Sequence, residues 1–306
     1  MSRGADGVTM LPGERGVQTP FRRFVSDYCE SPLAVVAFFI AVVVLFIAIF
    51  SPWIAPTDPY DLKKLSILDN MLPPGSKSMS GTTFWLGTDA LGRDMLSAIF
   101  YGLRTSILVA VSSAVAAQCI GIVVGLSAAY FGGIVDTLVM RLVDIKLGFP
   151  SILVALILLS ILGPGVDKII IALIVAQWPW YTRVMRSTAL AERNREYIEA
   201  AQCLALGRAR IVFRHLLPNC LPPMIVIGTV QVAHAVAIEA TLSFLGLGLP
   251  PTEPSLGLLI ANGFEFVLSG NYWISFFPGF ALLIMIVSIN LVGDQVREVL
   301  NPRLQR

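Results

Sequence analysis

The chain contains six stretches that carry no Asp, Glu, Lys or Arg and are long enough to enter a lipid bilayer. They are Leu33–Phe50, Thr105–Phe131, Leu147–Val166, Ile169–Thr182, Leu216–Ile238 and Phe266–Gly293. A transmembrane helix needs about 20 predominantly apolar residues. Only 14% of the 306 residues are charged, against about 25% in a soluble domain. The sequence therefore predicts an all-α integral membrane protein, a helical bundle of about six transmembrane helices.

The fourth window has only 14 residues, a length that also suits a re-entrant or interfacial segment. Lys168 and Arg183 flank it, and both side chains are long enough to reach toward water and extend the segment to a full crossing. The crossing is also needed to place the lysine- and arginine-rich loops on one side of the membrane, as described next. We therefore count it as a span, with five or seven spans as the alternatives.

The orientation follows from the lysines and arginines near the span ends. The N-terminal tail carries four arginines, Arg183–Asn219 carries seven and the C-terminal end three, whereas Pro250–Tyr272 has no lysine or arginine. Positively charged loops stay in the cytoplasm, so both termini and the arginine-rich segment are expected there. The expected parts are a cytoplasmic tail (1–30), a first transmembrane helix (31–54), a periplasmic loop with an interfacial helix (55–103), a five-helix core (104–295) with a cytoplasmic loop at 187–217, and a cytoplasmic tail (296–306).

Small residues recur every four positions along the second window. They are Ser113, Ala117, Gly121, Gly125 and Ala129. Such a ridge lets another helix backbone approach closely. It predicts tight helix packing, either within this chain or at a seam with a second membrane subunit.

Four charged residues lie close together ahead of the third window: Asp136, Arg141, Asp144 and Lys146. Arg141 and Asp144 are three residues apart and can pair on a helix. A continuous helix over 134–162 would be about 43 Å long, more than the ~30 Å hydrocarbon core, so its first turns should lie in the cytoplasm. We interpret these charges as the solvated foot of a helix, with a proton or ion relay as the alternative. Pro150 is expected to kink the helix or to end its first segment.

The fifth window continues to Glu239, a carboxylate that the pattern places inside the membrane. A charge there is costly and indicates function by default. Gln231, Ala235 and Glu239 are four residues apart and share one helix face, which predicts a candidate translocation pathway. A buried, hydrogen-bonded structural acid is the alternative for Glu239. His234 is expected to pack, with a titrating role as the alternative.

The outer loop ends in the motif Leu86-Gly87-Thr88-Asp89, followed by Gly92-Arg93-Asp94. Thr88 or Asp89 is expected to cap a helix whose first turn contains Asp94. A structural role at the membrane surface is favoured over contact with a partner that delivers substrate. Two carboxylates without His or Cys partners do not indicate a metal site.

The arginine-rich segment predicts a cytoplasmic docking surface. A short helix around Glu199, a turn near Gly207 and a second, arginine-rich helix are expected, and Pro218 marks the return to the membrane. The small residues Ala200, Ala201 and Ala205 would let a partner approach closely, while the surrounding charges orient it. The formal net charge of +2 gives no indication of nucleic acid.

These residues resemble the inner-membrane permeases of bacterial ABC importers. Glu199-Ala200-Ala201 and Leu217-Pro218 match the signature of that family, and Ala205 occupies the position where glycine is usual, with Gly207 two residues later. Further motifs resemble the C-type subunit of the dipeptide, oligopeptide and nickel importers: Leu86–Asp89 with Gly92–Asp94, Tyr130–Gly133, Leu242–Gly246, Asn290–Asp294 and Pro302–Leu304.

The resemblance implies the fold of a type I ABC importer transmembrane domain in the bacterial inner membrane, and a non-catalytic permease for peptides or a related small solute. Its implied partners are a homologous second permease, two ATPases, a solute-binding protein and membrane lipid. The ATPases would hydrolyse ATP, since no phosphate-binding Gly-x-x-x-x-Gly-Lys-Ser/Thr loop occurs here, and no cofactor is expected on this chain. The residues implied to couple it to the ATPases are Glu199, Ala200, Ala201, Ala205, Gly207, Leu217 and Pro218.

Two other classes compete with an importer subunit. A proton-coupled secondary transporter would use Glu239, His234 and Asp144 as a relay, but it gives no role to the arginine-rich segment. A membrane scaffold would need no polar face on the fifth span. Uptake that depends on ATP and survives collapse of the proton gradient separates the first two classes.

Overall fold

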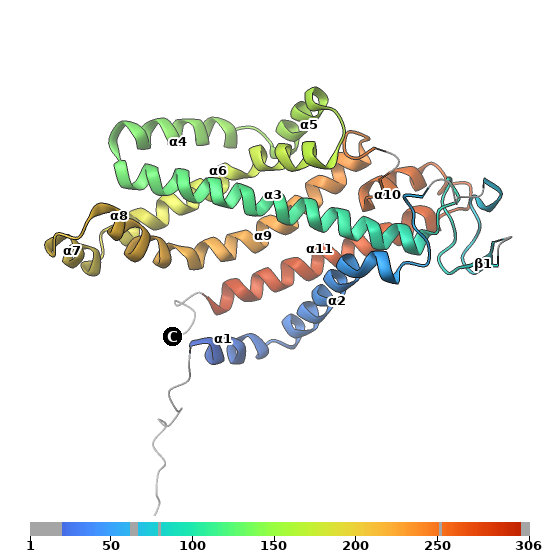
Figure 1. Cartoon of the computed structure of the whole chain (residues 1–306), viewed down its shortest axis with the longest axis horizontal. Coiled ribbons are helices and arrows are strands. Elements are labelled where there is room, and N and C mark those ends of the chain that lie inside the picture. Colours follow the sequence, from blue (N-terminus) through green and yellow to red (C-terminus); the bar gives the residue numbers. More distant parts are fainter. Residues whose placement is uncertain (1–19, 62–66, 79–80, 251–252, 301–306) are drawn as a thin grey trace, which may run out of the picture.

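A computed structural model of the chain describes residues 20–61, 67–78, 81–250 and 253–300. Long helices run side by side along the molecule (Figure 1). Their bounds are α1 Pro20–Cys29, α2 Pro32–Ile54, α3 Met95–Phe131, α4 Gly133–Leu147, α5 Ser151–Leu162, α6 Val166–Arg193, α7 Glu196–Cys203, α8 Arg208–Arg210, a π-helical segment Ile211–Leu216, α9 Leu217–Phe244, α10 Leu256–Phe264 and α11 Trp273–Val299. A 3-10 turn, Ile67–Asp69, and the antiparallel pair β1 Ser76–Lys77 and β2 Thr83–Phe84 precede α3.

Four helices in the described part of the chain are long and apolar enough to cross a membrane: α2, α3, the continuous helix 208–244 and α11. The pair α4 and α5 makes a fifth span if the two halves are counted together. The short fourth window lies in the 28-residue helix α6, which is outside this set. The helical membrane bundle is confirmed, with four to five helices in this apolar set. Helix α6, about 42 Å long at 1.5 Å per residue, has the length of a crossing, so the sixth span stays a prediction.

The two ends of the bundle differ in the elements that they carry (Figure 1). Helix α7 and the C-terminal end of α11 lie toward one end, together with α1, which contacts α11. The β1–β2 pair and α10 lie at the other end. The arginine-rich segment and the C-terminal end of α11 thus lie toward the same end, as the predicted orientation requires. The assignment of this end to the cytoplasm stays a prediction.

The predicted interruption at Pro150 is confirmed, and 134–162 does not form one continuous helix. The chain breaks between Leu147 and Ser151, and the axes of α4 and α5 are bent by 87°. Pro150 explains the break, because a proline disfavours a helical backbone in the residue before it. Asp144 pairs with Arg183 of α6, and not with Arg141 as expected. The break therefore changes where the charges of α4 lie.

The small-residue ridge of α3 packs against α6 of the same chain. All five of its residues are buried. A Cβ atom on Gly121 would lie 2.3 Å from the Cβ of Tyr181, and one on Gly125 would lie 2.6 Å from the carbonyl oxygen of Thr182. The ridge therefore serves packing within the chain, the first of the two predicted alternatives.

The outer motif forms a buried, hydrogen-bonded turn ahead of α3. Asp89 accepts a hydrogen bond from Nε of Arg93 at 2.7 Å, and both side chains are almost fully buried. The cap of α3 is Asp94 itself, which accepts from the backbone N–H of Ser97 at 2.9 Å, so the predicted cap at Thr88 or Asp89 is wrong. Within the described residues of 55–103, the helix expected after Asp94 forms the first turns of α3, which begins at Met95. Its interfacial position stays a prediction.

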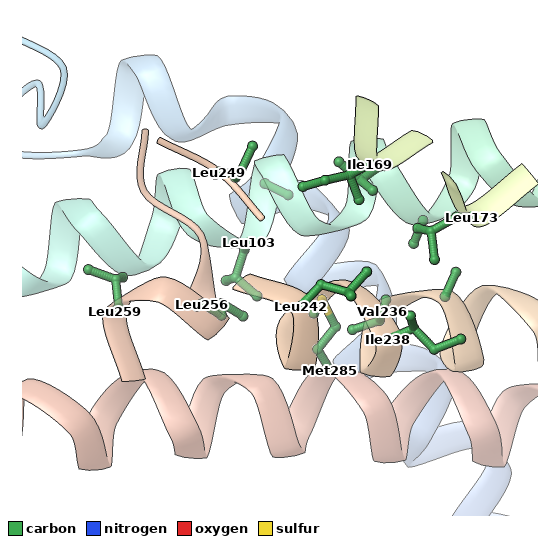
Figure 2. Close-up of a cluster of buried hydrophobic side chains, with 14 of the residues drawn as sticks. Leu103, Ile169, Leu173, Val236, Ile238, Leu242, Leu249, Leu256, Leu259 and Met285 are labelled. Carbon is green, nitrogen blue, oxygen red and sulfur yellow. The ribbon is translucent and has the colours of Figure 1, made fainter. Parts of the chain in front are cut away.

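The main apolar core lies where α3, α6, α9, α10 and α11 meet (Figure 2). Leu103 of α3, Leu242 of α9 and Met285 of α11 are among its buried side chains. A second cluster joins α3, α6, α7 and the π-helical segment through Tyr181, Met185 and Ile198. This second cluster positions helix α7.

Candidate functional site

Helix α7 presents one face to the bundle and the other to solvent. Ile198 and Ala201 are buried in the second cluster, whereas Glu199 and Ala200 are exposed. The hydroxyl of Tyr197 donates to Oε2 of Glu192 at 2.8 Å and ties α7 to the end of α6. Burial and this hydrogen bond raise the pKa of Tyr197 to about 12, so the hydroxyl keeps its proton at neutral pH. Glu199 and Ala200 are thus exposed on a helix whose opposite face is packed against the bundle.

A Schellman turn ends α7 at Ala205. The N–H of Leu206 donates to the carbonyl of Ala201 at 3.2 Å, and the N–H of Ala205 donates to that of Gln202 at 2.9 Å, which is the hydrogen-bond pattern of this motif. Ala205 has φ +52°, the left-handed region that favours glycine. The turn therefore remains at the position where the family usually has glycine, and it is not shifted to Gly207, where φ is −59°.

We expect Ala205→Gly to stabilise this turn by about 1 kcal/mol, because a left-handed backbone costs an L-residue about 1–2 kcal/mol. Hydrogen exchange of the Leu206 amide should slow about fivefold. The matched change Ala200→Gly, inside α7, should accelerate the same exchange, since glycine weakens a helix interior. Acceleration by both changes would contradict the strain assigned to Ala205.

The seven arginines of Arg183–Asn219 divide into two groups. Arg183 pairs with Asp144 at 2.5 Å, Arg186 forms two hydrogen bonds with Asp136, and Arg193 donates to the carbonyl of Ala129 at 2.9 Å. These contacts join α6 to α3 and α4. The others are exposed near α7 and at the start of the helix 208–244: Arg195, Arg208, Arg210 and Arg214. The expected short helix, turn and arginine-rich helix are thus present.

Leu217 and Pro218 begin α9 directly after the π-helical segment. Leu217 packs against the second cluster, and Pro218 is exposed. Proline is favoured in the first turn of a helix, where its missing N–H has no partner to lose. These two residues therefore fix the start of the membrane helix behind α7.

A cavity of about 650 Å³ lies between α5, α6 and α9. Gln231 and His234 of α9, Ser151 of α5 and Trp180 of α6 contribute to its lining, together with Ile152, Ile227, Val230, Ala237, Ile238 and Thr241. The lining is mostly apolar with a few polar groups, which is the usual character of a small-molecule site. Its volume would hold a ligand of the size of a short peptide.

Of the predicted pathway residues in the described structure, Gln231 lies on this cavity, whereas Ala235 and Glu239 are fully buried. Glu239 accepts hydrogen bonds from the hydroxyls of Ser106 on α3 at 2.7 Å and of Ser243 on α9 at 2.8 Å, and it also interacts with Ser255 before α10. Glu239 therefore fits the structural alternative, an acid that joins three elements in the core. His234 is exposed to the cavity and does not pack as expected.

Comparison with known proteins gives the family of the chain. Residues 121–306 match the family described as the binding-protein-dependent transport system inner membrane component. The chain belongs to this family. Residues 19–74 of the permease match the N-terminal transmembrane domain of oligopeptide transport permease C. With its several apolar helices, the permease is a multi-pass protein of the bacterial inner membrane.

Curated relatives match the permease over nearly all of its length. It is 36% identical over 288 residues to the di/tripeptide transport system permease protein DppC of Pseudomonas aeruginosa, covering 94% of this chain and 93% of the relative. It is 38% identical over 288 residues to the dipeptide transport system permease protein DppC of Escherichia coli (94% and 95%). It is 33% identical over 305 residues to DppC of Bacillus subtilis (100% and 91%).

The fold also matches a solved transporter. A chain from inward-facing conformations of the MetNI methionine ABC transporter aligns with a TM-score of 0.55 and 24% identity, over 67% of the permease and 97% of that chain. This likeness confirms the fold of an ABC importer transmembrane domain.

The position of Lys146 in the permease differs from the one that its sequence context predicts. Its ammonium donates a hydrogen bond to the carbonyl of Ala176, in α6, and lies 3.5 Å from Oγ of Ser151. Lys146 was expected in a solvated cytoplasmic foot, yet it lies beside the cavity. The signal was present in Gly148 and Pro150, which break the helix directly after Lys146.

Proposed function

We propose that this chain is one of two permease subunits of an ATP-driven importer that carries dipeptides or other short peptides across the inner membrane. Its implied partners are a homologous second permease, two ATPase subunits and a solute-binding protein. The observation that carries this proposal is α7, a helix fixed on its inner face by Ile198 and Ala201 and exposed at Glu199 and Ala200. The peptide class is supported by what the curated relatives are described as transporting.

Helix α7 suits the transmission of force to the membrane helices. Its inner face belongs to the cluster that contains Tyr181 and Met185 of α6 and Met224 of α9. A displacement of α7 by the ATPases would therefore reach two long helices through packed side chains. In this mechanism ATP closes the ATPase pair, α7 acts as a lever, the cavity opens outward, and hydrolysis resets the subunits.

The proton-coupled alternative has no support in the contacts of its three residues. Asp144 pairs with Arg183, Glu239 accepts from two serine hydroxyls, and His234 lies on the cavity. Each acid thus already has a partner outside the suggested relay.

Two measurements test the proposal. Purification of the chain from a native membrane in mild detergent should recover a homologous permease and ATPase subunits, identified by mass spectrometry. Uptake of a dipeptide should fail when ATP is depleted and persist when an uncoupler collapses the proton gradient. Recovery of this chain alone, with uptake that follows the proton gradient, would overturn the importer assignment.

A further inference from the structure

We propose that Lys146, together with Ser151, Gln231 and His234 on the adjoining cavity, forms a binding site for the α-carboxylate of the peptide in transit. The inference rests on the proposed function and adds a recognition site to it. No acidic residue belongs to the described lining of the cavity.

The helix break sets the ammonium of Lys146 against the middle part of α6. Its partner Ala176 is the tenth residue after Val166, the first residue of α6. At a rise of 1.5 Å per residue this is about 15 Å from the outer end of that helix, close to the middle of a ~30 Å hydrocarbon core. A cation at this depth is expensive and, next to a cavity, marks a pathway for substrate or ions. Lys146 reaches the cavity through Ser151, which belongs to the lining.

The ammonium of Lys146 has no carboxylate partner in the part of the chain that the structure describes. Its two hydrogen bonds there go to the carbonyl of Ala176 and, at 3.5 Å, to the hydroxyl of Ser151. The nearby acid Asp144 pairs with Arg183. An ammonium has three N–H donors, so one donor remains to bind an anion that enters the cavity.

The polar groups of the cavity lining can also donate hydrogen bonds. His234 is within electrostatic range of the ammonium and can donate a ring N–H, the amide of Gln231 donates two N–H groups, and Ser151 has a hydroxyl. Apolar side chains from α5, α6 and α9 complete the lining. One positive charge with neutral donors in an apolar cavity suits a single carboxylate attached to apolar side chains.

A single cation also suits a transport pathway. A site that conducts must bind its substrate strongly enough for entry and weakly enough for release. Lys146 is only half-buried, and water therefore moderates its attraction for a carboxylate. The site would orient the peptide without trapping it.

The test compares uptake of an apolar dipeptide with uptake of its C-terminal amide by the complete importer in proteoliposomes. Rates are normalised to the fraction of solute-binding protein loaded with each peptide. The variants are Lys146→Met, Lys146→Arg and the matched control Lys168→Met, which removes a lysine that pairs with Asp167 at the outer end of α6. The ion pairs of Asp136 and Asp144 with α6 remain in the Lys146 variants and hold α4 in place.

We expect Lys146→Met to slow uptake of the free dipeptide about tenfold, as for loss of one charge-assisted hydrogen bond. Uptake of the amide should change less than twofold, and Lys146→Arg should restore most of the preference for the carboxylate. Equal slowing of both peptides, or no change in either, would overturn the inference. Failure of the wild-type complex to take up any peptide would overturn the proposed function instead.

A second readout applies even when the amide is not transported. Acylation of Lys146 by an amine-reactive reagent, quantified by mass spectrometry of the wild-type complex during turnover, reports whether the ammonium is occupied. The free dipeptide should protect Lys146 and leave Lys168 unprotected, whereas the amide should protect neither. Equal labelling of Lys146 with and without the dipeptide would contradict the site.

Discussion

Glu199→Lys should abolish uptake while the protein still inserts and folds. Glu199 is exposed in the first turn of α7, where lysine opposes the helix dipole by only about 0.3–1 kcal/mol. The same change reverses a charge on the proposed ATPase-binding face, and like charges brought together across an interface cost several kcal/mol. A loss of about 3 kcal/mol corresponds to roughly a hundredfold slower uptake. Uptake in proteoliposomes and co-purification of the ATPases measure the effect.

Two companion variants sharpen this prediction. Gly207→Asp should give the same loss of uptake. A Cβ atom at Gly207 meets nothing within 4 Å, so the chain can accept the side chain and should still fold. Glu30→Lys makes the same charge reversal on another exposed residue of the predicted cytoplasmic side and should transport normally. If Glu199→Lys transports like Glu30→Lys, α7 does not couple this chain to an ATPase.

The apolar windows predict the membrane helices well, because a long span is apolar over its whole length whether its side chains face other helices or lipid. The window Leu33–Phe50 falls within α2, and the cluster of arginines marks the end that carries α7. The small-residue ridge also predicts close packing, since only small side chains allow the approach of α3 and α6. These features depend on local composition, which a sequence displays directly.

Features that depend on tertiary contacts could not be predicted. Gly148 and Pro150 indicate a break, but the sequence does not give the 87° bend that sets Lys146 against α6. The helical spacing of Gln231, Ala235 and Glu239 predicts one shared face, yet only the position of α3 decides that Glu239 meets Ser106 and is buried. Likewise, Ala205 does not reveal its left-handed backbone, because alanine usually avoids it.

Gly121→Ala should strongly destabilise the folded protein, although it adds a single methyl group. The new Cβ would lie 2.3 Å from the Cβ of Tyr181 and 2.9 Å from the backbone nitrogen of Thr182, and a neighbouring helix backbone cannot yield as a flexible side chain can. Overpacking typically costs about 1–3 kcal/mol, and we expect the upper end here. The yield of monodisperse protein and its thermal midpoint should both fall.

The control for this prediction is Gly279→Ala in α11, where a Cβ atom meets nothing within 4 Å. The same methyl group should there be neutral or stabilising by up to about 1 kcal/mol, because alanine favours a helix more than glycine does. Both glycines lie inside membrane helices, so the pair separates close helix packing from the general effect of the substitution. If the two variants behave alike, the contact between α3 and α6 is not the constraint that requires glycine at position 121.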